Sequence, residues 1–394
     1  LLMTSRLVGY AGSPIPGAKE LELLAFEREQ QEGFVEVWFG EEKAKGETFL
    51  EVLRQNPQVR GLGRIPLMLA LMCRAHQEGQ LSVPTRRVEV YQLCLRGLLR
   101  DWLGEKQRRE VSDVYVDAQV ELLEAVAYDL FREGYEQFGE GLLRMKMKPH
   151  LEKLNHTNEL FGRTAESLIA EMKNDGILTT IAEHGEAKLI FLHRTFQEYL
   201  AAGGLAAQLK GDSEQAWVVV DRKAWDPEWE PVIVYLAARL GDIAVGKNTS
   251  DEQDRNRGLS QLKHLLGLLS DTRKDDFFRH RLALAAQCLP EIPAQVRVKL
   301  SREIEKITTA VFLVWWQHAT RQTDQTVQHM TRALPQLAIV NGHVEGQPLR
   351  EWLISRLHRR GKRTRDAAIQ AVGHLGSAGA TSEILASLAQ LLKN

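Results

Sequence analysis

Apolar residues recur at helical spacing along most of the chain. Between about residues 21 and 105 they lie three or four positions apart in 27–39, from Pro66 onward, and in 86–103. Proline is favoured at the first position of a helix, because its missing N–H would have no partner there, so Pro66 marks a helix start. We therefore expect this region to be a helical domain.

The pattern of apolar residues changes between residues 106 and 210, where helical spacing gives way to strand-like runs. Three further helices are expected, around Asp117–Arg132, Leu142–Leu154 and Thr164–Asn174. The β-branched run 177–181, the turn-forming residues 183–186 and the apolar run 188–192 then predict a β-hairpin. Three helices closed by a hairpin are the element order of a winged-helix domain.

A capping box is expected just after the hairpin, in Thr195-Phe196-Gln197-Glu198. The Thr195 hydroxyl can accept a hydrogen bond from the N–H of Glu198, and the Glu198 carboxylate can accept one from the N–H of Thr195. An apolar helix over 199–209 should follow.

From residue 211 to 394 the pattern predicts helices and no strand. The stretches 279–289 and 365–375 resemble each other, since each has a basic start, an alanine-rich middle and a leucine near its end. Alanine-rich faces let stacked helices approach closely, so we expect HEAT-like repeats. An irregular tandem of helices is the alternative. The fold class predicted for the chain is mainly α.

Composition excludes some partners and compartments. Lys and Arg total 51 against 52 Asp and Glu, so no global field attracts nucleic acid or membrane. No apolar run approaches the ~20 residues that a membrane span needs. The three cysteines form no CxxC pair and lie in apolar patterns, which fits buried thiols in a reducing cytoplasm. We expect neither a membrane nor a nucleic-acid partner.

Three residues are candidates for binding a nucleotide. Arg6 follows a short apolar strand and precedes a glycine-rich loop, where a phosphate could meet it, or it is a surface arginine. Pro66 could form an apolar wall against a flat ring, or simply begin its helix. His193 precedes a helix N-terminus, which attracts anions and disfavours imidazolium; a core histidine bonded to a backbone carbonyl is the alternative.

Two further features bear on function. The run 356–365 is strongly basic, which fits a solvated loop between helices, or else a phosphate or an acidic partner. The sequence contains no GxxxxGK[ST] loop, no apolar strand that ends in paired acids, no HExxH and no GxSxG motif. These residues therefore assemble no complete catalytic centre, and we expect the chain alone to be inactive.

Three segments, in order, resemble the NACHT family of STAND NTPases, the switches of innate immunity, antiviral defence and cell death. The stretch 3–10 looks like the sensor-1 strand, and 56–71 like the helical-domain motif with its adenine-side proline. The stretch Phe191-Leu192-His193-Arg194-Thr195-Phe196-Gln197-Glu198-Tyr199-Leu200-Ala201-Ala202 is similar to the winged-helix signature. The resemblance covers about residues 1–240.

The resemblance implies four parts: residues 1–20 as a C-terminal remnant of the P-loop NTPase core, 21–105 as the NACHT helical domain, 106–210 as the winged helix, and 211–394 as a HEAT-like sensor. It implies that Arg6 senses the γ-phosphate, that Pro66 packs near adenine, and that His193 contacts the β-phosphate of ADP. The phosphate-binding loop and the Mg-binding acids would then lie upstream of Leu1, in the P-loop half of the same protein.

The function implied is an ATPase switch that ADP holds closed. A protein or other ligand on the repeats would open it, and ATP would then permit homo-oligomerisation. The alternative is a scaffold without nucleotide control, whose winged helix and repeats bind protein or DNA. DNA has little support, because 163–175 carries Glu166, Glu171 and Asp175 among few basic residues, whereas a DNA-reading helix is normally basic.

Overall fold

We describe the fold from a computed structural model. It describes residues 24–79, 86–100, 112–155, 160, 162–183, 186–211, 213–247, 251–359, 361–376 and 379–391. The strand and loop expected over 1–20, with Arg6, lie outside these residues. The chain divides into two compact units, one ending at Gly204 and the other beginning at Leu205. The described residues are mainly helical, as expected.

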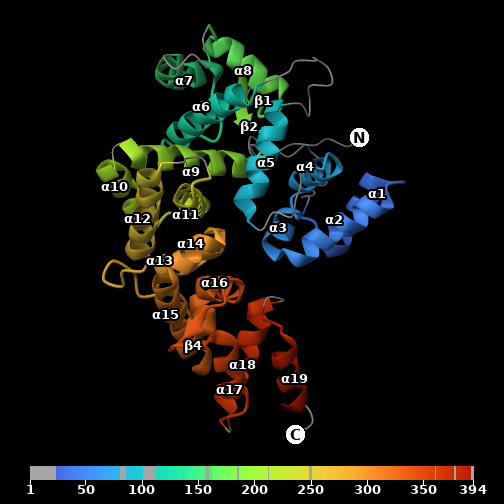
Figure 1. Cartoon of the computed structure of the whole chain (residues 1–394), viewed down its shortest axis with the longest axis vertical. Helices are drawn as coiled ribbons and strands as arrows, with labels where there is room; N and C mark the ends of the chain where they lie inside the picture. Colours follow the sequence, from blue (N-terminus) through green and yellow to red (C-terminus); the bar gives the residue numbers. More distant parts are fainter. Residues whose placement is uncertain are drawn as a thin grey trace, which may run out of the picture. The chain divides into compact units, whose positions relative to one another are not determined.

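The first described elements of the first unit are helices (Figure 1): α1 (Arg28–Phe39), α2 (Lys43–Gln55), α3 (Pro57–Leu62), α4 (Pro66–Gln77) and α5 (Arg87–Arg100). Pro66 is the first residue of α4, as predicted, after Ile65 in extended backbone. The buried face of α4 carries Met68, Leu69, Met72 and Cys73, and it packs against α2 and α5. The apolar spacing of the sequence thus becomes the core of this helical group.

Three helices and a hairpin follow: α6 (Asp113–Arg132), α7 (Glu140–Asn155), α8 (Ala165–Asn174), β1 (Leu178–Glu183) and β2 (Glu186–Phe191). The strands pair antiparallel, with Leu178 opposite Phe191, so the predicted hairpin is confirmed. Phe138, between α6 and α7, makes a backbone bridge with Leu189 of β2, and its N–H and C=O both bond that residue. This bridge ties the α6–α7 connection to the hairpin.

Helix α9 (Arg194–Gly211) approaches α6 closely at two consecutive glycines. A Cβ atom on Gly204 would lie 2.6 Å from Cβ of Tyr128 and closer still to the carbonyl oxygen of Glu124. A Cβ atom on Gly203 would overlap the Glu124 side chain. The helices can therefore cross at this distance only because these positions lack side chains.

The second unit consists of helices packed on their sequence neighbours: α10 (Ser213–Lys223), η2 (Pro227–Trp229), α11 (Glu230–Val245), α12 (Glu252–Leu269), α13 (His280–Cys288), η3 (Leu289–Glu291), α14 (Ala294–Lys299), α15 (Ser301–Thr320), η4 (Asp324–Val327), α16 (Gln328–Ile339), α17 (Leu349–Leu357), α18 (Lys362–Leu375) and α19 (Ser382–Leu391). Gly258 brings α12 within 3.0 Å of the backbone of α11, measured from an added Cβ. The two stretches that resemble each other are α13 and α18, and both bury their alanines.

The prediction of no strand after residue 211 was wrong in one place. Strands β3 (His343–Val344) and β4 (Gln347–Pro348) form a two-residue hairpin. Glu345 and Gly346 between them have φ of 53° and 78°, which is the left-handed pair of a type I′ turn. Strands of two residues show no alternation of apolar and polar positions, so the pattern could not reveal them.

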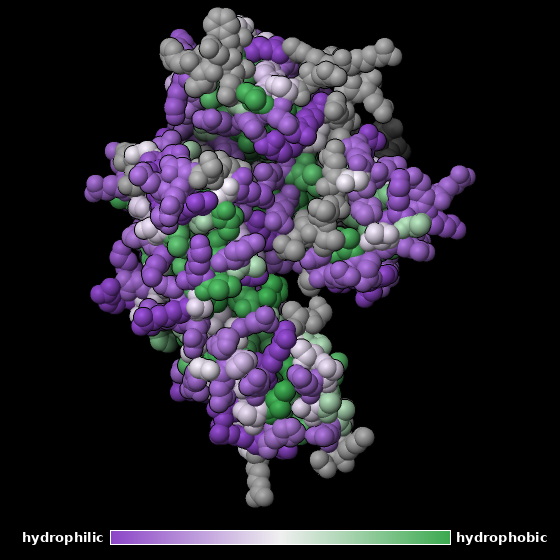
Figure 2. Space-filling view, in the orientation of Figure 1, coloured by the Kyte–Doolittle hydropathy of each residue, from purple (hydrophilic) through white to green (hydrophobic). Residues whose placement is uncertain are grey.

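The basic run 356–365 spans two helix ends and a short connection, rather than one loop. Helix α17 ends at Leu357 and α18 begins at Lys362. Figure 2 has the orientation of Figure 1, and its surface is hydrophilic at the lower end of α17. Of the described side chains in the run, only Leu357 is buried, which fits the expectation of a solvated segment.

The cysteines and the helix lengths test two further expectations. Cys73, Cys94 and Cys288 are buried free thiols, as expected, and burial raises the pKa of Cys73 to about 12. In the part of the chain that the structure describes, no helix has both the length and the apolar character needed to cross a bilayer.

Candidate functional site

The candidate site lies where the hairpin passes into α9. Strand β2 ends at Phe191, which is buried against the ring of Phe138 at 5.9 Å between centroids. The N–H of Leu192 still bonds the carbonyl of Ile177 at 2.8 Å, so the pairing holds the chain until one residue before His193. Phe191 lies in the core, whereas His193, two residues later and beyond the end of β2, is half-buried.

His193 itself caps α9. The N–H of Thr195 donates to Nδ1 of His193 over 3.2 Å, and the Thr195 hydroxyl lies 2.9 Å from the same nitrogen. A backbone N–H can only donate, so Nδ1 accepts and carries no proton, and the ring proton of the neutral imidazole is on Nε2. The imidazole is therefore held as a neutral donor at the positive end of the helix dipole.

The predicted capping box was wrong in its residues. Helix α9 begins at Arg194, so Thr195 lies inside its first turn, and its N–H is taken by His193. Glu198 instead accepts from Nε of Arg194 at 3.3 Å. The imidazole Nδ1 takes the place of the serine or aspartate oxygen that usually caps a helix. The carboxylate of Glu198 is attracted to the Arg194 cation instead of the backbone.

Neighbouring side chains hold this first turn in place. Arg194 pairs with Glu136 as well as Glu198, and its guanidinium lies over the ring of Phe131, 5.8 Å from the centroid. The Gln197 amide donates to the carbonyl of Tyr135 at 2.9 Å. The charge of Arg194 is thus balanced within the fold, and His193 is the residue of this turn that could donate to a phosphate.

Helix α5 supports the other face of α9. The ring of Tyr91 stacks on Tyr199 with 5.4 Å between centroids and meets Phe196 edge-on at 5.4 Å. All three rings are buried. These aromatic contacts join the helical group 86–100 to the helix that carries His193. The sequence singled out His193 but missed Tyr91 and Arg194 as the residues that position it, although Arg194 stands within the quoted motif.

Of the other two predicted residues, Pro66 is the one that the structure describes. Pro66 is exposed at the start of α4, which packs with α1, α2 and α5. No described contact joins Pro66 to His193, and Arg6 lies outside the described residues. Of the three candidates, the structure gives a defined chemical role to His193 alone.

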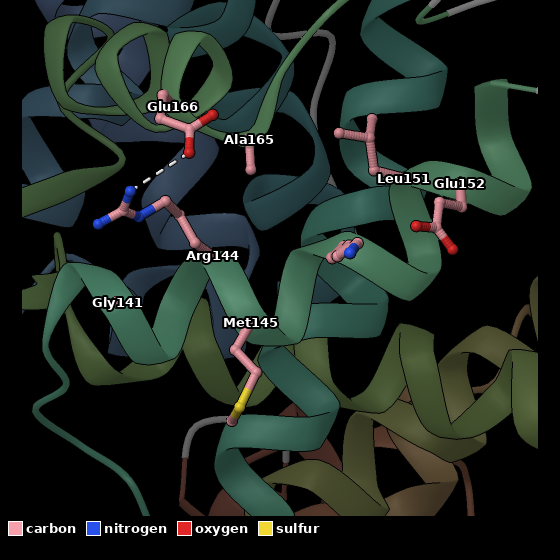
Figure 3. A pocket seen from close by; sticks show the side chains of 8 residues that line it. Gly141, Arg144, Met145, Leu151, Glu152, Ala165 and Glu166 are labelled. Atoms are coloured by element: carbon pink, nitrogen blue, oxygen red, sulfur yellow. Dashed lines mark hydrogen bonds and ion pairs between the residues drawn. The ribbon is translucent and has the colours of Figure 1, made fainter.

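A shallow pocket of about 600 Å³ opens between α7 and α8 (Figure 3). Arg144 of α7 and Glu166 of α8 form an ion pair across it at 3.3 Å, and the exposed Met145 lines one side. Both partners of this ion pair are exposed, so the pair contributes little to stability.

Neither the models of known protein families nor the curated proteins match this chain. Among the described residues, no group of three or more His, Cys, Asp or Glu side chains could hold a metal ion. Function must therefore be argued from the site itself.

Proposed function

We propose that this chain is the nucleotide-sensing and ligand-sensing part of a NACHT-type STAND switch. In the resting state, Nε2–H of His193 donates to the β-phosphate of ADP and holds the switch closed. Ligand binding to the repeats opens it, and exchange for ATP permits oligomerisation. The observation that carries the proposal is the cap of α9, where Thr195 occupies Nδ1 of His193 and leaves the proton on Nε2.

A winged-helix domain over 106–210 is part of this proposal. The bridge between Phe138 and Leu189 supports it, because α6, α7, α8 and the hairpin are then tied into one body. In such a body, a bond made or broken at His193 affects the position of the whole domain and not only that of one turn. Arg194 and Gln197 carry this effect directly to the α6–α7 connection.

We call the proposed bond from His193 to the β-phosphate the clamp. Its free energy can be taken from bonds of the same kind. A hydrogen bond to a charged group contributes about 1.5–3 kcal/mol, which corresponds to a factor of roughly 10–150 in an equilibrium constant. A ligand on the repeats must therefore bind the open state more tightly by a comparable factor, or the closed state persists.

The charges around α8 favour this switch over a DNA-reading scaffold. Lys173 pairs with Glu140 at 2.7 Å, and Arg163 pairs with Glu171 at 2.8 Å. Glu171 also accepts from the Tyr115 hydroxyl at 2.6 Å. The cations near this helix are thus neutralised within the fold, whereas a helix that reads DNA presents them to phosphates.

Two substitutions at one position test the proposal. Asn is a good N-cap, so His193→Asn should keep α9 intact while removing the donor at Nε2; His193→Ala removes both, at a cost of about 1 kcal/mol in stability. The measurement is the ADP retained by the purified protein that carries this chain together with a phosphate-binding loop, determined by mass spectrometry.

We expect ADP exchange to accelerate about ten- to a hundredfold in both variants, and both should form more oligomer in the absence of ligand. The unfolding temperature of His193→Asn should stay close to that of the unmodified protein. If His193→Asn retains ADP and remains monomeric like the unmodified protein, the clamp does not exist. If only His193→Ala responds, the effect belongs to the helix cap and not to a phosphate contact.

A further inference from the structure

Five cations at the meeting of α17 and α18 form what we call the basic junction: Arg356, Arg359, Lys362, Arg363 and Arg365. Arg356 lies over the buried ring of Trp352, 4.4 Å from its centroid. None of the five has a carboxylate within 4.0 Å among the described residues. Arg359, Lys362 and Arg363 are exposed, so their charge faces solvent.

Three other exposed cations of the same unit are paired with acids. Lys263 lies 2.7 Å from Glu303, and Lys210 lies 2.9 Å from Asp254. Asp254 also holds Arg257 at 3.0 Å. Between residues 356 and 366 the sequence has six Lys and Arg but only one acid, Asp366. The basic junction therefore concentrates positive charge that the fold does not use.

Two of these charges lie where they oppose helix stability. Lys362 and Arg363 occupy the first turn of α18, which contains no acid, and its N-cap Gly361 offers no side-chain bond. The N-terminal end of a helix is positive, so cations there are disfavoured and acids preferred. Their presence needs a reason other than folding, and binding to an anion supplies one.

We propose that the basic junction binds the phosphodiester backbone of nucleic acid. Arginine predominates in it, and the planar guanidinium donates two parallel bonds to a phosphate. Lys362, Arg363 and Arg365 lie within about 5 Å along the helix axis, a density of charge matched by a duplex with one charge per ~1.7 Å. The carboxylates of a folded protein surface are rarely so dense.

A lipid surface fits the basic junction less well. Peripheral membrane binding combines cations with apolar side chains that insert among the lipids. Leu357, within the run, is buried, and the nearest large exposed apolar residue, Ile369, comes one turn later in α18. The expectation of no nucleic-acid partner rested on net charge and on 163–175, and neither concerns this surface.

This inference goes beyond the nucleotide switch and does not depend on it. The test measures binding of a fluorescent oligonucleotide of about 20 nucleotides, single- or double-stranded and of mixed sequence, by anisotropy at several salt concentrations. The variant Arg359→Gln/Arg363→Gln/Arg365→Gln is compared with Lys299→Gln/Arg302→Gln/Lys306→Gln. The control removes the same charge from three exposed cations in a segment that also contains Glu303 and Glu305.

For the variant in the basic junction we expect Kd to rise at least about tenfold near 100 mM salt, and the slope of log Kd against log salt to fall by about 2–3. The control should stay within about twofold of the unmodified chain, and base sequence should have little influence. Binding that is absent from the unmodified chain, or equal loss in both variants, overturns the proposal. So does displacement by poly-glutamate as strong as by unlabelled DNA, which would identify an acidic protein as the partner.

Discussion

Substitution of Gly204 by alanine should separate α9 from α6 and so disturb the helix that begins at His193. The added Cβ would meet the carbonyl oxygen of Glu124 and Cβ of Tyr128 at 2.6 Å or less, and neither belongs to the movable end of a side chain. The adjacent Gly203 is a matched control, because the three atoms nearest to its added Cβ all belong to the Glu124 side chain, which can rotate.

The magnitudes follow from two opposing effects. Each substitution gains about 1 kcal/mol, because alanine favours a helix over glycine by that amount. Overpacking against fixed atoms costs about 1–3 kcal/mol, occasionally more, and relief at Gly204 requires the helices to separate by about 1 Å. Because both atoms met at Gly204 are fixed, we take the cost there at the upper end, about 3 kcal/mol, so Gly204→Ala should destabilise by about 2 kcal/mol net. At Gly203 the side chain can move, so Gly203→Ala should be close to neutral.

Urea unfolding followed by far-UV circular dichroism measures the difference, provided that the transition of the first unit is resolved from that of the second. Thermal unfolding should show the same order, with a gap of roughly 4–8 °C for a unit of this size. Equal stability of the two alanine variants, or greater loss at Gly203, would show that the two helices do not meet as closely as described.

Three further outcomes are expected. Arg281→Met should cost about 2–3 kcal/mol in urea unfolding, because it removes a buried guanidinium that pairs with the half-buried Asp221 at 2.7 Å and donates to the carbonyl of Leu268; Asp221→Asn should add little to it. Asp175→Asn should stabilise above about pH 6, by about 1 kcal/mol after solvent screening, and not below about pH 4. Burial and, to a lesser degree, Glu171 raise the pKa of Asp175 to about 6, so the folded state binds its proton more tightly and loses stability as pH rises through that range; pH-dependent unfolding tests this. Lys362→Glu should raise stability by about 0.3–1 kcal/mol at low salt while weakening oligonucleotide binding, and a change of both in the same direction would contradict the argument from the helix dipole.

The hairpin and most helices could be predicted because their signals are local. The run 177–181 is β-branched, and the structure pairs Leu178 with Phe191 as that pattern suggests. Pro66 begins α4 because a proline at that position needs no partner for its nitrogen. In each case the residues that reveal the element are also the residues that form it.

Features that depend on a neighbour could not be predicted. The pattern Thr-x-x-Glu at Thr195 fits a capping box, but Arg194 pairs with Glu198, and His193 takes the amide that the pattern assigned to it. Arg281 looked like the basic start of a repeat, yet it is 2% exposed and spans from α13 to Asp221 of α10. No periodicity in the sequence records such partners.

The cap on α9 links local folding to the proposed clamp. Thr195 fixes the tautomer of His193 through a bond that the helix needs in order to start, so the donor at Nε2 exists before any nucleotide arrives. Binding then has no cost for reorienting the ring, and the contact is strongest for an anion at that end of the helix. Arg194 and Gln197 join the same turn to the segment between α6 and α7, so loss of the anion should loosen that segment first. Hydrogen exchange at residues 131–138 should therefore become faster when ADP leaves. An unchanged rate would show that the cap of α9 does not transmit the loss of ADP.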